Sequence, residues 1–209
     1  MIRTLIADDH AVFREGLGRI LDSSNGFDVV GEAASGGEAL ELARRLDPDV
    51  VVLDIWMPGR GGVETIQELK RTLPELRILV LTAHPENHYA VRCLRSGADG
   101  YVTKDRRGAE IVEAIRKVHA GGVFVSPGLA ELLALSVKRD ARQMPHETLS
   151  DREFQVMTMI AAGRTVSEIG VELNLSVKTI STYRSRVLAK LRLRNNAEIM
   201  RYGVEESLL

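Results

Sequence analysis

The chain has 209 residues, of which 44% are hydrophobic and 27% are charged, and its formal net charge is −1 at pH 7. This composition excludes disordered, collagen-like and low-complexity chains, and the length leaves room for two domains. No apolar run approaches the roughly 20 residues of a membrane helix, and the first ten residues become acidic too early for a signal peptide, so we expect a cytoplasmic protein without a membrane partner.

Residues 1–122 alternate short β-type runs with longer amphipathic runs. Several of the β-type runs are apolar almost throughout, which is typical of strands buried on both faces. Five strand–helix units in strict alternation predict an α/β domain, in which helices cover both faces of a five-stranded parallel, doubly wound sheet. The predicted strands are residues 2–7, 27–33, 49–54, 76–82 and 100–102, and the predicted helices are residues 11–24, 36–47, 63–73, 86–97 and 108–122.

The segment that follows, residues 123–147, shows no strand pattern. Ser126 and Pro127 are an N-cap residue and a first-turn proline, and this pair is typical of a helix start. A polar stretch that contains Pro145 follows the helix. We therefore predict a linker with one short helix over this segment.

Residues 148–209 predict a small all-α domain. Two capping boxes mark helix starts in it, one formed by Ser150 with Glu153 and one by Thr165 with Glu168. The order along the chain is thus an α/β domain, a linker and a helical domain.

Charged and hydroxyl side chains stand at the carboxyl ends of four predicted strands. Each has an ordinary structural explanation by itself, because an aspartate can cap a helix, a threonine suits a strand and a lysine suits an exposed loop. The carboxyl ends of parallel strands meet at one edge of the sheet, where open α/β folds bind their ligands, so all of them together indicate a site. The residues are Asp8 and Asp9 after the first strand, Asp54 after the third, Thr82 at the end of the fourth and Lys104 after the fifth.

Three carboxylates that come together repel each other, and a bound cation would offset this repulsion. If the first and third strands are neighbours, Asp8, Asp9 and Asp54 meet, and such hard oxygen ligands suit Mg²⁺. Zinc is disfavoured because the five histidines are scattered and no Cys/His ligand spacing occurs. An acidic magnesium pocket with a lysine and a hydroxyl can accept a phosphoryl group, and Asp54 on the central strand is the best-placed nucleophile.

The motifs ADDH, LDIWMPGRGG, VLTAH and GADGYVTKD resemble those of bacterial response-regulator receiver domains, over residues 1 to about 122. The resemblance implies a flavodoxin-like fold with the strand order 2-1-3-4-5. Gly61 departs from the family pattern, because an acidic residue is common there, but this changes the loop and not the chemistry. By resemblance, Asp54 is the phospho-acceptor, Asp8 and Asp9 bind Mg²⁺ with the main-chain carbonyl of Trp56, Thr82 and Lys104 bond the phosphoryl oxygens, and Tyr101 moves inward with Thr82.

Phosphorylation of Asp54 would act as a local electrostatic switch. It adds roughly −1.5 to −2 charges and three acceptor oxygens, which draw the Thr82 hydroxyl toward the site and vacate space for Tyr101. We expect the surface from the fourth helix to the fifth strand to repack. The repacking would change dimer affinity or release the second domain. The coupling free energy between phosphorylation and this change would be about 1–3 kcal/mol.

A basic helix–turn–helix pattern lies within the helical domain. Between Ser176 and Arg201 there are seven Lys/Arg residues against one Glu, so this segment has a net charge of +6. A short turn at residues 174–176 separates two helical segments. On a helical wheel of residues 177–192, the apolar face holds Val177, Ile180, Val187, Leu188 and Leu191, and the opposite face holds Lys178, Thr182, Ser185, Arg186 and Ala189.

The outer face of this second helix is small, polar and basic, which suits the major groove of double-stranded DNA. The pattern alone leaves two alternatives open. A solvated face on an ordinary helical bundle has the same residue types, and helix–turn–helix shapes also occur in protein-binding modules.

The segment LSDREFQVMTMIAAGRTVSEIGVELNLSVKTISTYRSRVLAKL resembles the LuxR-type DNA-binding domain of NarL/FixJ response regulators, and the match spans residues 148–209. Tyr183 stands where the family often has histidine. The resemblance also implies that part of the last helix pairs two DNA-bound domains, although we expect most of Ala197, Met200, Val204 and Leu208 to pack within the domain. By resemblance, Ser181, Thr182 and Ser185 contact base edges, and Lys178, Thr179, Arg184, Arg186 and Lys190 contact phosphates.

The sequence therefore favours a transcription factor that a sensor histidine kinase phosphorylates on Asp54, and that forms a homodimer when phosphorylated or DNA-bound. We expect no enzyme activity beyond catalysis of its own phosphorylation and slow dephosphorylation. A phosphatase or phosphotransferase for small molecules is disfavoured, since such enzymes need a second acid where Trp56 stands. The +6 segment disfavours a protein-binding adaptor, and the complete set of acids, Thr82 and Lys104 disfavours a regulator that ignores phosphorylation.

Overall fold

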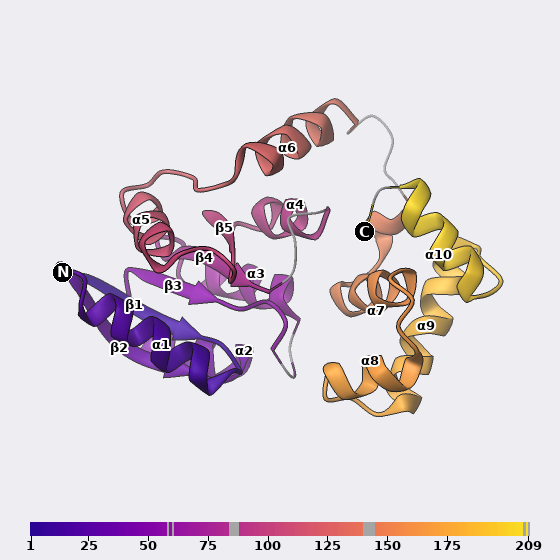
Figure 1. Ribbon diagram of the computed structural model, residues 1–209, viewed down its shortest axis with the longest axis horizontal. Helices are drawn as coiled ribbons and strands as arrows, with labels where there is room; N and C mark the ends of the chain where they lie inside the picture. Colours follow the sequence, from indigo (N-terminus) through magenta and orange to yellow (C-terminus); the bar gives the residue numbers. More distant parts are fainter. Residues whose placement is uncertain (58, 60, 84–87, 140–144, 207, 209) are drawn as a thin grey trace. The chain divides into compact units, whose positions relative to one another are not determined.

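The computed structural model describes residues 1–57, 59, 61–83, 88–139, 145–206 and 208. The chain folds into two compact units, Met1–Ala134 and Leu135–Leu209 (Figure 1). The first unit contains a five-stranded parallel sheet with the strand order β2-β1-β3-β4-β5, which confirms the predicted doubly wound, flavodoxin-like architecture. Its strands are β1 (Ile2–Ala7), β2 (Phe27–Ala33), β3 (Val50–Leu53), β4 (Arg77–Thr82) and β5 (Gly100–Thr103).

Six helices lie in or begin in the described part of the first unit. Ser126 caps the last of them as predicted, because its hydroxyl accepts a hydrogen bond of 3.1 Å from the Leu129 amide. That helix continues to Arg139, and residues 140–144 of the predicted linker lie outside the described residues. The helices are α1 (Ala11–Asp22), α2 (Gly36–Leu46), α3 (Gly62–Thr72), α4 (His88–Arg95), α5 (Gly108–His119) and α6 (Pro127–Arg139).

Helix α2 shows how local chemistry sets the boundaries. The Ser35 hydroxyl accepts a hydrogen bond from the Glu38 amide at 3.2 Å, and the Glu38 carboxylate accepts one from the Ala34 amide at 2.8 Å. At the other end, Asp47 adopts a left-handed conformation with φ 46°, which an aspartate tolerates better than most residues. The helix therefore ends at Leu46, one residue before the sequence-based boundary.

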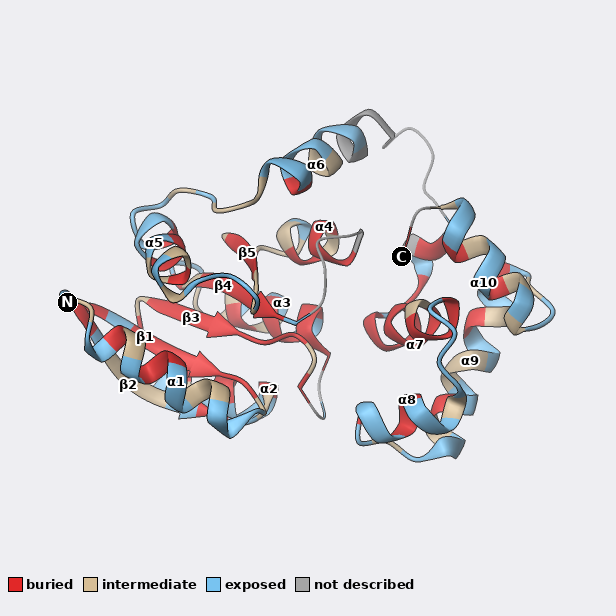
Figure 2. Ribbon diagram, viewed as in Figure 1, coloured by how far each residue is buried: buried red, intermediate tan, exposed pale blue. Residues whose placement is uncertain are grey.

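The sheet forms the centre of the first unit. All four residues of β3 are buried, and five of the six residues of β4 are buried (Figure 2). Leu17 and Leu21 of α1 pack with Ile111 and Ile115 of α5 on one face of the sheet. Helices α2, α3 and α4 cover the other face (Figure 1). Burial on both faces explains the continuous apolar runs in the sequence.

The register of the strands brings the polar residues together. Ala7 of β1 pairs with Leu53 of β3, and the Asp54 amide donates a hydrogen bond of 2.8 Å to the Ala7 carbonyl. The Lys104 amide donates one of 2.7 Å to the Thr82 carbonyl across β5 and β4. The residues that follow these strands therefore emerge side by side at one edge of the sheet.

A short piece of the linker extends the sheet beyond β5. Phe124 forms a parallel bridge with Gly100, its carbonyl accepts a hydrogen bond of 2.9 Å from the Tyr101 amide, and its amide donates one of 3.1 Å to the Asp99 carbonyl. The sequence showed no strand pattern after residue 122, so this pairing was not predicted. The linker thus covers part of the outer edge of β5.

The second unit contains helices and no strand in the residues described, as predicted. The hydroxyls of Ser150 and Thr165 accept hydrogen bonds from the amides of Glu153 and Glu168, and both capping boxes are complete. Helix α7 packs against the two helices that close the chain. The elements are the 3-10 turn η1 (Pro145–Thr148), α7 (Asp151–Ala161), α8 (Val166–Glu172), α9 (Val177–Leu191) and α10 (Asn196–Glu205).

Helix α10 does not pack as the sequence suggested. Ala197 is exposed, and Met200 and Val204 are 38% and 66% exposed, so the expectation that these residues pack within the domain is wrong. The helix instead buries Ile199 and Gly203, which lie on a different stripe. Leu208, beyond the helix, is buried as expected.

Replacement of Gly100 by alanine should destabilise the protein. The new Cβ would lie 2.8 Å from Leu79 Cδ1, 3.1 Å from Val118 Cγ1 and 3.0 Å from the Phe124 carbonyl oxygen, and overpacking of this kind typically costs about 1–3 kcal/mol. Gly16→Ala in α1 is the matched control, because a Cβ there meets nothing within 4 Å and should stabilise the helix by about 0.5–1 kcal/mol. Urea unfolding followed by circular dichroism measures both changes. Equal stability of Gly100→Ala and the wild type would contradict the close approach.

Candidate functional site

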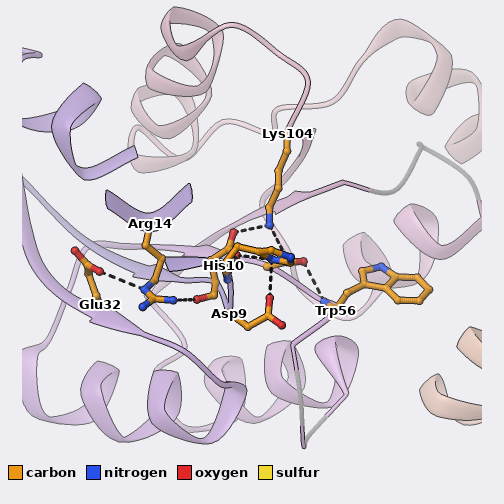
Figure 3. Close-up of polar contacts among 8 residues, drawn as sticks. Asp9, His10, Arg14, Glu32, Trp56 and Lys104 are labelled. Carbon is orange, nitrogen blue, oxygen red and sulfur yellow. Dashed lines mark hydrogen bonds and ion pairs between the residues drawn. The ribbon is translucent and has the colours of Figure 1, made fainter. Parts of the chain in front are cut away.

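Two buried carboxylates share one lysine at the carboxyl edge of the sheet. The Lys104 ammonium group lies 2.5 Å from Asp8 Oδ2 and 2.6 Å from Asp54 Oδ2 (Figure 3). The Asp8 and Asp54 side chains are only 3% and 4% exposed. The structure therefore brings together three of the predicted site residues in direct contact.

The loop after β3 holds the Asp54 side chain in place. Asp54 Oδ1 accepts a hydrogen bond of 3.0 Å from the Trp56 amide. Gly62, at the start of α3, lies so close to Ile55 that a Cβ on Gly62 would be 2.4 Å from Ile55 Cβ and 2.6 Å from the Ile55 carbonyl oxygen. Because only a glycine fits there, Gly62 lets α3 begin directly beside the residue that follows Asp54.

The environment changes the pKa values of the central pair. Burial raises the pKa of Asp54, and repulsion from Asp8 adds to this effect, while the charge and hydrogen bond of Lys104 oppose it without cancelling it. Burial by itself would lower the pKa of Lys104, but attraction and hydrogen bonds from Asp54 and Asp8 outweigh it, so that pKa is raised. Lys104 is therefore positively charged, and the site has more carboxylates than the lysine neutralises.

The remaining negative charge fits a divalent cation. Asp8, Asp9, His10 and Asp54 each offer one ligand atom, and these atoms all lie within 4.8 Å of one another. Asp9 Oδ1 is buried and accepts no hydrogen bond from the described residues, so it has a lone pair available to a metal ion. Hard oxygen ligands with this spacing suit Mg²⁺, and the residues present therefore fit the ion that the sequence predicted.

Arg14 supports the acidic loop and was not singled out in the sequence. Its guanidinium group donates a hydrogen bond of 2.5 Å to the Asp8 carbonyl and one of 3.2 Å to Glu32 Oε2 on β2 (Figure 3). His10 was also missed, although its ring lies beside both Asp8 and Asp9. The position of Arg14 in the first turn of α1 could have indicated its contact. Helical side chains point back toward the N-terminus of the helix, and therefore toward this loop.

Thr82 and Tyr101 lie on adjacent strands near the pocket. Both side chains are buried, with exposures of 0% for Thr82 and 1% for Tyr101. The strands β4 and β5 pair Val80 with Tyr101 and Thr82 with Thr103. Tyr101 is thus packed inside the unit while its amide bonds the linker at Phe124.

The predicted DNA-contacting residues on α9 divide into two groups. Lys178, Ser181, Thr182, Ser185 and Arg186 are exposed, while Thr179, whose hydroxyl lies 2.8 Å from the Ser176 hydroxyl, is half-buried. The Thr182 and Ser185 hydroxyls donate to the carbonyls one turn earlier, so that their oxygens can still accept hydrogen bonds from outside. The exposed members form a continuous polar face.

Arg184 and Lys190 instead bond inside the second unit. Arg184 Nε donates to the Asn196 side chain, and Lys190 Nζ lies 2.6 Å from Glu153 Oε2 and 3.2 Å from the Thr148 carbonyl. Burial by itself would raise the pKa of Glu153, but hydrogen bonds from Lys190 and from the Ser150 amide outweigh it and lower that pKa. These two cations therefore connect α9 to α10 and to the start of α7.

Val177 corrects the helical-wheel analysis. It was placed on the apolar, inward face of α9, but it is 52% exposed. Ile180, Val187 and Leu191 are buried as expected. Val177 is the first residue of the helix, where no preceding turn covers it, so the apolar stripe begins one turn later.

Asp54→Asn should stabilise the metal-free protein at neutral pH. A carboxyl group with a raised pKa binds its proton more tightly in the folded state, so its ionisation reduces stability as the pH rises through the interval between the unfolded and folded pKa values. The advantage of Asp54→Asn should therefore shrink as the pH falls toward 3.8, the ordinary value for this carboxyl group. Urea unfolding in EDTA across this pH range measures the difference in stability between Asp54→Asn and the wild type.

Mg²⁺ at about 100 times its Kd should add about 2.7 kcal/mol to the free energy of unfolding of the wild type. It should add less to that of Asp54→Asn. A wild type whose stability Mg²⁺ leaves unchanged would contradict the metal site.

Two family models match the chain. The model of the response regulator receiver domain matches residues 4–116, and the model of bacterial regulatory proteins of the luxR family matches residues 147–203. The first match covers the α/β unit with its acidic edge, and the second covers the helices that carry the exposed polar face.

Relatives match over the whole chain. The response regulator GacA of Pseudomonas viridiflava is 41% identical over 100% of this chain and 98% of its own, and the response regulator UvrY of Escherichia coli K12 is 38% identical over 100% and 96%. RcsB of Salmonella enterica serovar Typhimurium, solved bound to promoter rprA with the phosphomimetic BeF3⁻, is 26% identical over 96% of this chain and 97% of its own, with a TM-score of 0.63. The chain therefore belongs to the NarL/FixJ family of response regulators, in which a receiver domain is joined to a LuxR-type DNA-binding domain.

Proposed function

We propose that Asp54 accepts a phosphoryl group from the phosphohistidine of a sensor histidine kinase, and that this modification controls DNA binding. A carboxylate oxygen of Asp54 attacks phosphorus, the P–N bond breaks, and its electron pair leaves with the imidazole. The contact of Lys104 with both Asp54 and Asp8 is the observation that supports this proposal best. From this position, the ammonium group would bond the incoming phosphoryl oxygens.

Asp8, Asp9, Asp54 and the main-chain carbonyl of Trp56 would hold Mg²⁺ in this site. When bound, the ion supplies positive charge that offsets the developing charge on the phosphoryl oxygens. Arg14 fixes the loop that carries two of these ligands through its hydrogen bond to the Asp8 carbonyl. The protein would catalyse its own phosphorylation and slow dephosphorylation and act on no other substrate.

Thr82 and Tyr101 would transmit the change. The Thr82 hydroxyl bonds a phosphoryl oxygen, and the ring of Tyr101 repacks into the space that Thr82 vacates. Tyr101 also bonds the linker through its amide, so a shift of β5 reaches the segment that leads to the second domain. This route supports a phosphorylation-dependent change in dimer affinity or domain release.

The exposed face of α9 would enter the major groove of double-stranded DNA. Ser181, Thr182 and Ser185 would contact base edges, and Lys178, Thr179 and Arg186 would contact phosphates. Arg184 and Lys190 would contribute their charge to the same surface while they keep their internal bonds. A homodimer would place two such helices on paired half-sites.

The proposed setting is the cytoplasm, where the DNA and the kinase's cytosolic phosphohistidine are both available. The presence of a LuxR-type DNA-binding domain supports this location. None of the helices in the described part of the chain is long and apolar enough to cross a bilayer.

A binding experiment with a phosphoryl mimic tests the control by Asp54. With Mg²⁺ and beryllofluoride, DNA affinity in fluorescence anisotropy should change by about 5- to 150-fold, the range of 1–3 kcal/mol of coupling. Asp54→Asn should abolish the change, while Asp28→Asn, an exposed aspartate on β2, should keep it. Binding of the wild type that beryllofluoride leaves unaltered would overturn the proposed control, and an unaltered response of Asp54→Asn would overturn the acceptor.

Substitutions on α9 should separate DNA contacts from internal bonds. Lys178→Ala should weaken binding to all sequences and lower the salt slope by about 1, while leaving stability unchanged. Lys190→Ala should lose the ion pair with Glu153 and destabilise the protein by about 1–2 kcal/mol. Thr182→Ala should change the sequence preference at one position. Anisotropy at several salt concentrations and urea unfolding measure these effects, and a Lys178→Ala variant that binds like the wild type would contradict the interface.

A further inference from the structure

A nitrogen ligand stands beside the carboxylates of the metal site. His10 Nδ1 lies 2.9 Å from Asp9 Oδ1 and 3.3 Å from Asp8 Oδ1 (Figure 3). The His10 side chain is 72% exposed, so the ring stands at the mouth of the pocket. His10 is not among the residues to which the resemblance to receiver domains gives a role.

The separations match those of neighbouring ligands on one ion. Two ligands about 2.1 Å from an octahedral cation and at right angles to each other are about 3.0 Å apart. The distances from His10 Nδ1 to the two aspartate oxygens lie close to this value. His10 Nδ1 can therefore share an ion with either of these oxygens, and all the possible ligand atoms lie within 4.8 Å of one another.

The buried oxygen of Asp9 points to the same conclusion. A charged oxygen next to an imidazole nitrogen would ordinarily take part in a hydrogen bond, but Asp9 Oδ1 accepts none in the described part of the chain despite the short distance. The lone pairs of Asp9 Oδ1 and His10 Nδ1 are thus close together, and no well-aligned hydrogen bond joins the two atoms. A cation between them satisfies both atoms.

We propose that His10 Nδ1 is an additional ligand at this site, and that the site therefore binds divalent transition-metal ions such as Mn²⁺ and Co²⁺ through nitrogen as well as oxygen. Imidazole binds such ions well, whereas Mg²⁺ prefers oxygen ligands and water. Loss of His10 should therefore weaken the binding of Co²⁺ and Mn²⁺ and leave that of Mg²⁺ nearly unchanged. This inference rests on the proposed function only because both use the carboxylates of Asp8, Asp9 and Asp54.

Metal titrations of the untagged full-length protein test the proposal. His10→Ala should bind Co²⁺ at least 10-fold more weakly than the wild type by calorimetry, while its Kd for Mg²⁺ should change less than twofold. His119→Ala is the matched control, because His119 is also exposed and lies at the end of α5. Asp9→Asn should weaken both ions, which shows that Co²⁺ occupies this pocket and not a separate histidine.

A spectroscopic measurement tests the bond directly. Pulsed electron paramagnetic resonance of the Mn²⁺-loaded protein should show coupling to a ¹⁴N nucleus in the wild type and in His119→Ala, and none in His10→Ala. Equal Co²⁺ affinities of the wild type and His10→Ala, or Mn²⁺ without nitrogen coupling, would overturn the proposal. A beryllofluoride response that persists in that case would leave the proposed function intact, whereas failure of every divalent ion to bind would overturn both.

Discussion

The structure of the receiver domain depends on one electrostatic arrangement, the sharing of a single lysine by two buried carboxylates on neighbouring strands. Asp8 and Asp54 are held together by the register of β1 and β3, and Lys104 reaches them from the end of β5. Without the lysine, two charges of the same sign would be buried in a medium of low dielectric constant, which is strongly unfavourable. With it, the site keeps an excess of negative charge, which fits a divalent cation.

The sequence predicted most of this arrangement because strand ends are easy to find. The bounds of β1 and β2 were predicted to the residue, since Asp8 interrupts the apolar run of β1, and Ser35, the N-cap of α2, closely follows β2. Helix ends were less accurate, because the left-handed conformation at Asp47 and the length of α6 depend on backbone geometry rather than on composition. The contacts of His10 and Arg14 were missed for a different reason, since they depend on how the first turn of α1 faces the loop.

The helical domain shows the limit of pattern analysis more clearly. A helical wheel identifies which residues share a face, but it contains no information about neighbouring elements. Lys190 and Arg184 were assigned to DNA phosphates by resemblance, and the sequence did not indicate that Glu153 and Asn196 bond them from other helices. Met200 and Val204 were expected inside because they are apolar, yet α10 turns another stripe to the core.

The pairing of Phe124 with β5 changes where the receiver domain should be considered to end. Open backbone groups on an outer strand are a template for association with other chains, and proteins commonly protect them with a covering segment. Phe124 satisfies the Tyr101 amide and the Asp99 carbonyl at that border. A receiver fragment cut after residue 122 would leave both groups open on its outermost strand and would tend to self-associate, so signalling studies of the isolated domain need the chain at least through Ser126.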